Sequence, residues 1–286
     1  MAARPKTLWA AVAPVVIGIA MAIADGVTHP LAATLAMLGA VLIQVGTNFY
    51  NDYADFKKGA DTEERLGPTR VTQAGLVSPG AVLAATVVAF GLAVVAGGYL
   101  MWRGGWPIVA VGVLSILFGV LYTAGRYSLA YLGISDIFVL IFFGPVAVGG
   151  TYYVQALTVP LDVLVAGLAP GLLAMAILLV NNIRDVETDR KAGKRTLIVR
   201  IGRRSGVVLY IVTVLAAFIV PPMLLLIDQS HAGVLITLVA LPLAFRNIMA
   251  LVRTKPEAAA TLNPLLGRTA QLLIVFSALF AIGWNL

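Results

Sequence analysis

The chain has 286 residues, of which 60% are hydrophobic and only 12% are charged, whereas a soluble globular protein carries about 25% charged residues. So few charges cannot cover a surface that faces water. The composition therefore predicts a polytopic membrane protein and excludes a disordered, collagen-like or secreted disulfide-rich chain. The chain has no cysteine, which excludes thiolate zinc sites, iron–sulfur clusters and a cysteine nucleophile.

Several stretches are apolar enough to be predicted as membrane-spanning helices, for which about 20 residues are needed. In chain order these nine stretches are residues 8–24, 31–50, 81–101, 106–122, 134–155, 161–182, 206–227, 232–246 and 266–285. The first is too long for the apolar part of a signal peptide and has no obvious cleavage site, so it is predicted as a span. The whole chain, 1–286, is predicted to be one all-α membrane domain.

The positions of Lys and Arg orient this helical bundle, because cytoplasmic loops of membrane proteins are enriched in both residues. With a cytoplasmic N-terminus and nine alternating helices, every Lys and Arg except Arg103 falls in a cytoplasmic segment. This pattern predicts a multi-pass protein of the cell membrane whose C-terminus lies outside. The net charge of +7 then follows from topology, so no nucleic-acid partner is predicted.

Acidic residues gather in two polar segments, 51–80 and 183–205, which follow the second and sixth predicted spans. Both segments are predicted at the cytoplasmic membrane face, because both spans run inward. Each segment carries one amide and two carboxylates at helical spacing: Asn48, Asp52 and Asp55 in the first, and Asn182, Asp185 and Asp189 in the second. Acids at a membrane edge are costly and indicate function. Two facing carboxylate stripes predict a Mg²⁺ site, since Mg²⁺ commonly takes one or two carboxylates together with substrate phosphates.

Basic residues follow both acidic clusters. They are Arg65 and Arg70 after the first cluster and Arg190, Lys191, Lys194 and Arg195 after the second. Carboxylates that hold a metal, with cations nearby, form a phosphate clamp. Membrane topology alone would also place cations here, and solvated loop charge remains the alternative for Glu63, Glu64 and Glu187.

These segments resemble the two aspartate-rich motifs of the UbiA-type intramembrane prenyltransferases. Asn48-x-x-Asn51-Asp52-x-x-Asp55, with Asp61 downstream, resembles the first motif, and Asn182-x-x-Asp185-x-x-x-Asp189 resembles the second. Residues 4–8, 51–59 and 193–197 are similar to the branch that acts on 1,4-dihydroxy-2-naphthoate. The resemblance runs from residue 4 to about residue 280.

Two positions depart from the pattern of the wider family. A third acid often stands four residues after the second in the first motif, but Gly59 stands there and the next acid is Asp61. Direct and water-mediated metal binding by Asp61 both stay open. Tyr122 and Arg126 stand where many relatives have a tyrosine and a lysine near the diphosphate, and arginine could donate two hydrogen bonds there. Asp136 matches an acidic position in related sequences, or is simply a favourable acid at a helix N-terminus.

The resemblance implies a UbiA-type helical bundle that uses Mg²⁺ to transfer a polyprenyl group from polyprenyl diphosphate to 1,4-dihydroxy-2-naphthoate. Diphosphate and CO₂ would leave, giving a demethylmenaquinol. The metal ligands would be Asp52, Asp55, Asp61, Asp185 and Asp189. Tyr122 would stabilise the allylic cation through its ring. The residues that bind the diphosphate or the acceptor would be Asn48, Asn51, Asn182, Arg65, Arg70, Arg126, Lys191, Lys194, Arg195, Arg4, Lys6 and Asp136; of these, Arg4 or Lys6 would pair with the acceptor carboxylate.

Two other readings stay open at this point. The same fold could prenylate another aromatic acceptor, such as 4-hydroxybenzoate or homogentisate. A cation-coupled transporter could use the acids as an ion path, but it should place polar residues near the midplane, whereas here the span centres are almost purely apolar. The sequence predicts membrane lipid as the surroundings, and it gives no prediction of prenyl chain length or oligomeric state.

Overall fold

The computed structural model describes residues 4–59, 67, 70–125 and 128–286, and every regular element in these ranges is helical. The predicted all-α class is therefore confirmed. The elements in chain order are α1 Pro5–Ala24, α2 Pro30–Lys57, α3 Pro79–Gly104, α4 Trp106–Leu121, α5 Leu129–Leu132, α6 Ser135–Phe142, α7 Pro145–Ala156, α8 Leu161–Arg184, α9 Val186–Lys191, α10 Leu197–Ile227, η1 Gln229–Ala240, α11 Leu241–Arg253, η2 Pro256–Leu262 and α12 Asn263–Trp284, where η denotes a 3₁₀ helix.

Eight helical segments within the described ranges are long and apolar enough to cross a membrane. The ninth predicted stretch forms α4, which is apolar but has only 16 residues. At 1.5 Å per residue α4 is about 24 Å long, shorter than the roughly 30 Å hydrocarbon core. The chain is a multi-pass membrane protein, and the crossing by α4 remains a prediction.

The second predicted span ends at residue 50, but α2 continues to Lys57. The last three turns of α2 therefore carry Asn48, Asn51, Asp52 and Asp55, all of them buried. The condition for the predicted polar stripe, a helix that extends into the acidic cluster, is met.

The predicted span 134–155 is interrupted at Gly144, which separates α6 from α7. A Cβ atom at Gly144 would lie 2.7 Å from the carbonyl oxygen of Gly167, and one at Gly171 would lie 2.9 Å from the Cα of Gly144. These glycines allow α6 and α7 to contact the backbone of α8, at a distance that a larger residue would prevent.

The predicted span 232–246 is longer in the structure. It begins in η1 and runs through α11 to Arg253. Pro242 stands in the first turn of α11, where the missing N–H of proline costs no helical hydrogen bond. The connection between the predicted spans 232–246 and 266–285 is thus shorter than the sequence suggests, and η2 occupies most of it.

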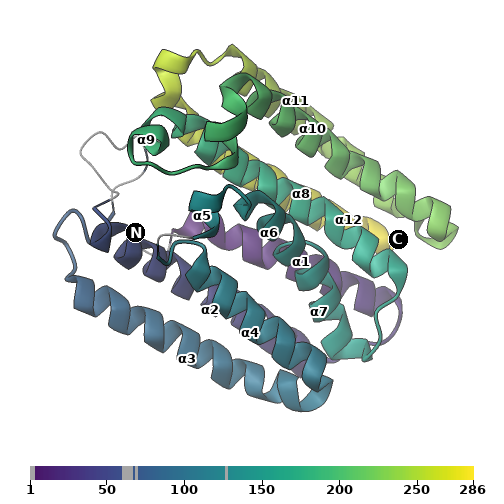
Figure 1. Cartoon of the computed structure of the whole chain (residues 1–286). Helices are drawn as coiled ribbons and strands as arrows, with labels where there is room; N and C mark the ends of the chain where they lie inside the picture. The colour runs from purple at the N-terminus through teal and green to yellow at the C-terminus, as the bar shows by residue number, and fades with distance from the viewer. Residues whose placement is uncertain (1–3, 60–66, 68–69, 126–127) are drawn as a thin grey trace.

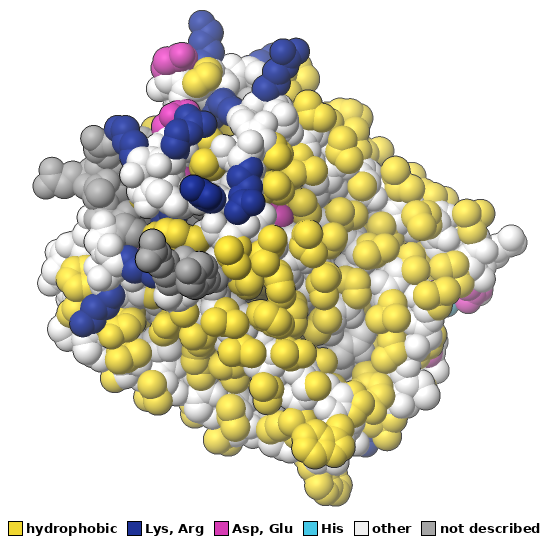
Figure 2. Space-filling view, viewed as in Figure 1, with side chains coloured by type: hydrophobic (Ala, Val, Ile, Leu, Met, Phe, Trp, Pro, Cys, Tyr) yellow, Lys and Arg dark blue, Asp and Glu magenta, His cyan; other side chains and the backbone are white. Residues whose placement is uncertain are grey.

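The helices, arranged as Figure 1 shows, pack around two hydrophobic cores of unequal size. The larger core contains fully buried side chains of α1, α8 and α12, among them Ile17, Leu173 and Phe276. A smaller core joins α2, α3, α4 and α7 through residues such as Leu100 and Ile108. Apolar side chains cover most of the face shown in Figure 2, and the Lys and Arg side chains gather toward one end of that face.

Candidate functional site at the polar end of the bundle

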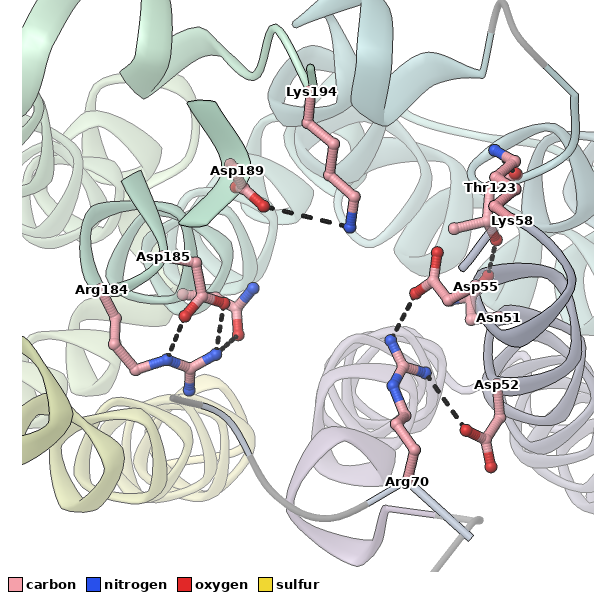
Figure 3. A network of polar contacts seen from close by, with 11 residues as sticks. Asn51, Asp52, Asp55, Lys58, Arg70, Thr123, Arg184, Asp185, Asp189 and Lys194 are labelled. Atoms are coloured by element: carbon pink, nitrogen blue, oxygen red, sulfur yellow. Dashed lines mark hydrogen bonds and ion pairs between the residues drawn. The ribbon is translucent and has the colours of Figure 1, made fainter. Parts of the chain in front are cut away.

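The first acidic motif lies in the last three turns of α2, and an arginine from the following segment contacts its carboxylates. Asp52 and Asp55 are each only 2% exposed. Arg70 Nη2 lies 2.5 Å from Asp55 Oδ2, and Arg70 Nη1 lies 3.8 Å from Asp52 Oδ1 (Figure 3). A single guanidinium therefore bridges both carboxylates, which offsets part of the cost of burying them.

The second motif lies where α8 ends and α9 begins. Asp185 is the residue between these helices, and Arg184 holds it through two hydrogen bonds, Nε to Oδ1 at 2.7 Å and Nη2 to Oδ2 at 2.5 Å. Arg184 also donates to Asn263 Oδ1 at 2.7 Å and to Asn181 Oδ1 at 2.8 Å. Because Arg184 is only 1% exposed, this network fixes Asp185 between α8 and the start of α12.

Asp189 and Lys194 bring the second motif toward the first. Lys194 Nζ lies 4.0 Å from Asp189 Oδ1. Burial is the main cause that raises the pKa of Asp189 to about 6; Asp185 and Asp55 add to the rise, and Lys194 opposes it. The pKa of Asp189 is therefore raised by one carboxylate of each motif. In Figure 3 the two carboxylate groups lie on opposite sides of a space, with the Lys194 side chain reaching toward it.

A third polar contact ties α2 to the segment after α4. The Thr123 hydroxyl donates to Asn51 Oδ1, and Lys58 Nζ donates to the Thr123 carbonyl oxygen at 2.5 Å. Lys58 Nζ also lies 4.5 Å from the centre of the Tyr131 ring. Burial lowers the pKa of Lys58, nearby Lys194 adds to this shift, and the Asp55 carboxylate opposes it.

A cavity of about 1020 Å³ starts at this polar region and continues between the helices. Asn48, Asn51, Asp52, Arg70 and Asn181 line its polar end. Its remaining lining is mostly apolar and includes small residues of α2, α3, α4 and α7. The volume is at the upper end of the ~300–1,000 Å³ range of small-molecule sites.

The cavity reaches the surface between helices. Val94 of α3 and Val113 of α4 line it and are also 51% and 59% exposed. Tyr122 and Phe138 also line it. A polar head with a long apolar tail could therefore enter from the bilayer and place its head among the carboxylates.

Arg4 and Tyr122, both predicted as site residues, line the cavity. The N-terminal segment is joined to the first motif, since Asn48 Nδ2 donates to Thr7 Oγ1 at 3.1 Å and Thr7 Oγ1 donates to the Arg4 carbonyl oxygen at 3.0 Å. Asp136 is buried in the first turn of α6 but is not part of the described cavity lining.

Asn182 was predicted to share a face with Asp185 and Asp189, but its neighbour Asn181 lines the cavity. Asn182 is buried, and its Nδ2 has no hydrogen-bond partner among the described residues. The prediction assumed one continuous helix through the motif. The chain instead changes direction at Asp185, so the helical spacing does not carry across it.

The cations after the second motif divide into two groups. Lys194 points into the site, whereas Lys191 and Arg195 are exposed. Arg190 pairs with Glu187 on the exposed surface, as expected for solvated loop charge. Four other predicted residues, Asp61, Arg65, Arg126 and the side chain of Lys6, lie outside the described residues, as do Glu63 and Glu64.

The sequence analysis did not single out Arg184, Asn181, Lys58, Thr123 or Asn263 as site residues. Three of them stand in or beside the motifs: Lys58 lies three residues after Asp55 of the first motif, Asn181 directly precedes the second motif, and Arg184 lies within it. Their positions so close to the motif acids could have marked these three residues as candidate site residues from the sequence. No local pattern marks Asn263, which reaches the site only through the packing of α12 against α8.

The donors at the site fit a hard divalent cation such as Mg²⁺, because they are carboxylate and amide oxygens. No group of three or more acidic or histidine side chains converges on one point within the described part of the chain. The acids form two pairs instead. This arrangement suits metal ions that each take one pair and complete their shells with phosphate oxygens and water.

Comparison with known proteins identifies relatives of the chain. Residues 11–265 match the UbiA prenyltransferase family. The 1,4-dihydroxy-2-naphthoate octaprenyltransferase of Haemophilus influenzae is 34% identical, over 98% of this chain and 93% of its own length. The protein of the same name from Mycobacterium tuberculosis is 38% identical, over 85% and 82%.

Solved structures share the fold. A UbiA homolog from Archaeoglobus fulgidus bound to GPP and Mg²⁺ has a TM-score of 0.61 at 16% identity, covering 97% of both chains. The apo structure of a UbiA homolog from Aeropyrum pernix has a TM-score of 0.69 at 14% identity, covering 94% of this chain and 97% of its own. At such low identity these similarities establish the fold alone.

Proposed function

Because the chain belongs to the UbiA prenyltransferase family, we propose that it transfers a polyprenyl group from polyprenyl diphosphate to 1,4-dihydroxy-2-naphthoate in menaquinone biosynthesis. The names of relatives at 34% and 38% identity support this acceptor. One observation carries the proposal: two facing carboxylate pairs lie at the polar end of a cavity of about 1020 Å³ that opens toward lipid.

The carboxylates serve the donor diphosphate. Asp52, Asp55, Asp185 and Asp189 would hold Mg²⁺, which supplies Lewis-acid stabilisation of the charge on the leaving diphosphate. Asn48 and Asn51 line the same end of the cavity and orient the diphosphate by hydrogen bonds. Asp61 is proposed as a further ligand.

Cations of the site neutralise the remaining phosphate charge. Arg70 and Lys194 contact the carboxylates, and both side chains reach the space where the diphosphate would lie. Charge-assisted hydrogen bonds from Arg and Lys to phosphate are stronger than neutral ones. Arg65 and Arg126 are proposed to add further donors, and the exposed Lys191 and Arg195 to attract the anionic substrate to the site.

The apolar cavity holds the prenyl tail and excludes water from the reacting carbon. When the allylic C–O bond breaks, its electron pair leaves with the diphosphate, and the ring carbon that bears the carboxylate bonds to the prenyl C1. The bond from that ring carbon to the carboxylate then breaks, CO₂ leaves, and the electron pair restores the aromatic ring. Tyr122 faces the allylic cation, and Arg4, which lines the cavity, pairs with the acceptor carboxylate.

The bundle is proposed to cross the cell membrane nine times, with the N-terminus and the active site on the cytoplasmic side. The charge distribution supports this orientation, because Lys and Arg gather at one end (Figure 2). Arg103 is the exception. It lies at the end of α3 and donates to the carbonyl oxygens of Val154 and Gln155.

Product formation by the purified protein in lipid nanodiscs tests this function. The protein is given Mg²⁺, a polyprenyl diphosphate and either 1,4-dihydroxy-2-naphthoate or 4-hydroxybenzoate, and the products are identified by mass. We expect a prenylated, decarboxylated naphthoquinol that disappears with EDTA. A prenylated 4-hydroxybenzoate would keep the donor site and overturn the acceptor. No product with either acceptor would contradict the proposed reaction.

A further inference from the structure

A second hollow lies between α10 and α11, and none of the described residues that line it also lines the cavity of the first site. This α10–α11 groove has a volume of about 540 Å³ and is lined at one end by Arg203 and Arg204 and along its walls by Val207, Val208, Ile211 and Val252. Val208 and Val252 are more than half exposed. The groove is therefore open to the bilayer along its apolar walls.

The polar end of the groove lies at headgroup depth. α10 is interrupted at Gly202, whose φ of 82° and ψ of 158° are not helical, so its continuous part runs from Arg203 to Ile227 and is about 37 Å long, which exceeds the roughly 30 Å hydrocarbon core. Its excess length falls at the end that carries Arg203 and Arg204, because the following residues are almost entirely apolar. Ile211 lies about 10 Å deeper than Arg204 along the helix axis. The groove thus changes from cationic to apolar over the depth at which a phospholipid changes from phosphate to acyl chain.

The two arginines are held differently. Arg203 donates to the carbonyl oxygens of Ile183 at 3.3 Å and Thr254 at 2.8 Å, so its guanidinium is fixed across the ends of α8 and α11. Arg204 is exposed and makes no hydrogen bond or ion pair with any residue that the structure describes. Its five N–H donors are therefore directed to the surroundings of the protein.

The charge around the groove is strongly positive. Arg253 and Lys255 flank Thr254, which also lines it. Glu257 is the one acid that influences Arg203 electrostatically among the described residues. Arg203 and Arg204 in its lining, with Arg253 and Lys255 on either side of Thr254, give the groove a local excess of positive charge that a phosphodiester would neutralise.

We propose that the α10–α11 groove binds an anionic phospholipid from the leaflet on the carboxylate side of the membrane. Its phosphate pairs with Arg204 and Arg203, and one acyl chain lies along Val207, Val208 and Ile211. Basic pockets between membrane helices bind anionic headgroups in this way. A zwitterionic lipid fits less well, because its ammonium would meet the same two arginines.

Native mass spectrometry of the detergent-purified full chain tests this site. Phosphatidylglycerol and phosphatidylcholine with the same acyl chains are added separately, and apparent Kd values are read from the bound fraction. Arg204→Gln removes one phosphate contact, and Val208→Trp fills the acyl part of the groove. Arg268→Gln, on the exposed surface of α12, removes the same charge elsewhere. Thermal unfolding checks that each variant is folded.

We expect one phosphatidylglycerol to bind more tightly than phosphatidylcholine. Its Kd should rise about fivefold in Arg204→Gln, from the loss of one surface cation, rise in Val208→Trp, and stay unchanged in Arg268→Gln. Equal binding of both lipids, or wild-type affinity in Arg204→Gln, would overturn the site. Displacement of the lipid by millimolar inorganic phosphate, with no effect of Val208→Trp, would show a free-anion site and overturn the lipid assignment.

Discussion

Two arginines hold the acidic residues of the site, and they do so differently. Arg184 is buried, adjacent in sequence to Asp185, and bonded also to Asn181 and Asn263, so it forms part of the scaffold. Arg70 reaches Asp52 and Asp55 from the segment after α2. We interpret Arg184 as a positioning residue and Arg70 as a residue whose guanidinium can move to the diphosphate.

Asp52→Ala and Asp185→Ala should each lower turnover by about 100-fold or more, because charge on the leaving diphosphate loses its stabilisation. Membrane insertion should be unchanged. Product formation in nanodiscs and the yield of membrane-extracted protein measure these two effects. Glu187→Ala is the matched control, since Glu187 is exposed and pairs only with Arg190 among the described residues. Substantial activity in both aspartate variants would contradict the metal assignment.

Arg184→Lys should weaken Mg²⁺ binding by about 10- to 100-fold, as is typical when the support of a metal ligand is lost. One ammonium cannot replace the paired N–H donors to Asp185 and also reach Asn181 and Asn263. The acceptors left unpaired should lower the free energy of unfolding by roughly 1–3 kcal/mol. Calorimetric Mg²⁺ titration and thermal unfolding measure both quantities.

Arg190→Lys is the control for that experiment, because the Arg190–Glu187 pair is exposed and exposed pairs contribute little. Equal Mg²⁺ affinity in Arg184→Lys and the wild type would show that Asp185 needs no positioning by Arg184.

Metal binding should depend on pH through Asp189, whose pKa is raised to about 6, chiefly by burial. A raised pKa means that Asp189 keeps its proton below pH 6 and is ionised above it, and a proton competes with Mg²⁺ for the carboxylate. Mg²⁺ affinity should therefore be about tenfold weaker at pH 5 than at pH 7. Titrations across this range, with Asp189→Asn as a variant that should bind weakly with little pH dependence, measure the effect. A flat profile in the wild type would contradict it.

The helices around the cavity have two tasks, to hold the polar groups at one end and to leave space behind them. The end of α8 performs the first, because the chain turns at Asp185 and places α9 across the site. Glycines of α2 and α4 perform the second. A Cβ atom at Gly39 or Gly112, both of which line the cavity, would meet no atom within 4 Å.

Gly39→Leu and Gly112→Leu should favour short prenyl donors, because each leucine fills part of the space proposed for the tail. We expect kcat/KM for a long-chain diphosphate to fall more than that for geranyl diphosphate. Gly91→Leu is the control. It introduces the same side chain on the exposed surface of α3, where it also meets open space. An equal loss for both donors would place the tail elsewhere.

The proposed orientation of the whole molecule in the membrane can be tested by labelling single cysteines from either side. The chain has no cysteine, so single cysteines can be introduced without background. Ala74→Cys, near the first motif, should react with a membrane-impermeant maleimide only in inverted vesicles. Ser230→Cys and Asn285→Cys, in the η1 and C-terminal segments, should react only from outside intact cells. Reaction of Ala74→Cys and Asn285→Cys from the same side would contradict nine crossings.

Composition and the length of the apolar stretches were sufficient to predict the helical class, and the approximate positions of the membrane segments follow from the same signals. The carboxylates could also be predicted, since acids are so rare in this chain that their grouping is informative. Element ends were less accurate. α2 extends seven residues beyond its predicted end, because buried contacts of Asn51 and Asp55 with Thr123 and Arg70 stabilise turns whose polar side chains resemble a loop.

The sequence by itself determined that this protein lies in a membrane and which acids form its two motifs, because hydropathy and helical spacing are local properties. Only the tertiary structure decided how the motifs meet. Arg184 and Asn263 lie far apart in sequence and touch through helix packing. Whether Asn181 or Asn182 lines the cavity depends on how α8 is rotated against its neighbours. The α10–α11 groove lies between two helices, and how they pack depends on shape complementarity that no single segment encodes.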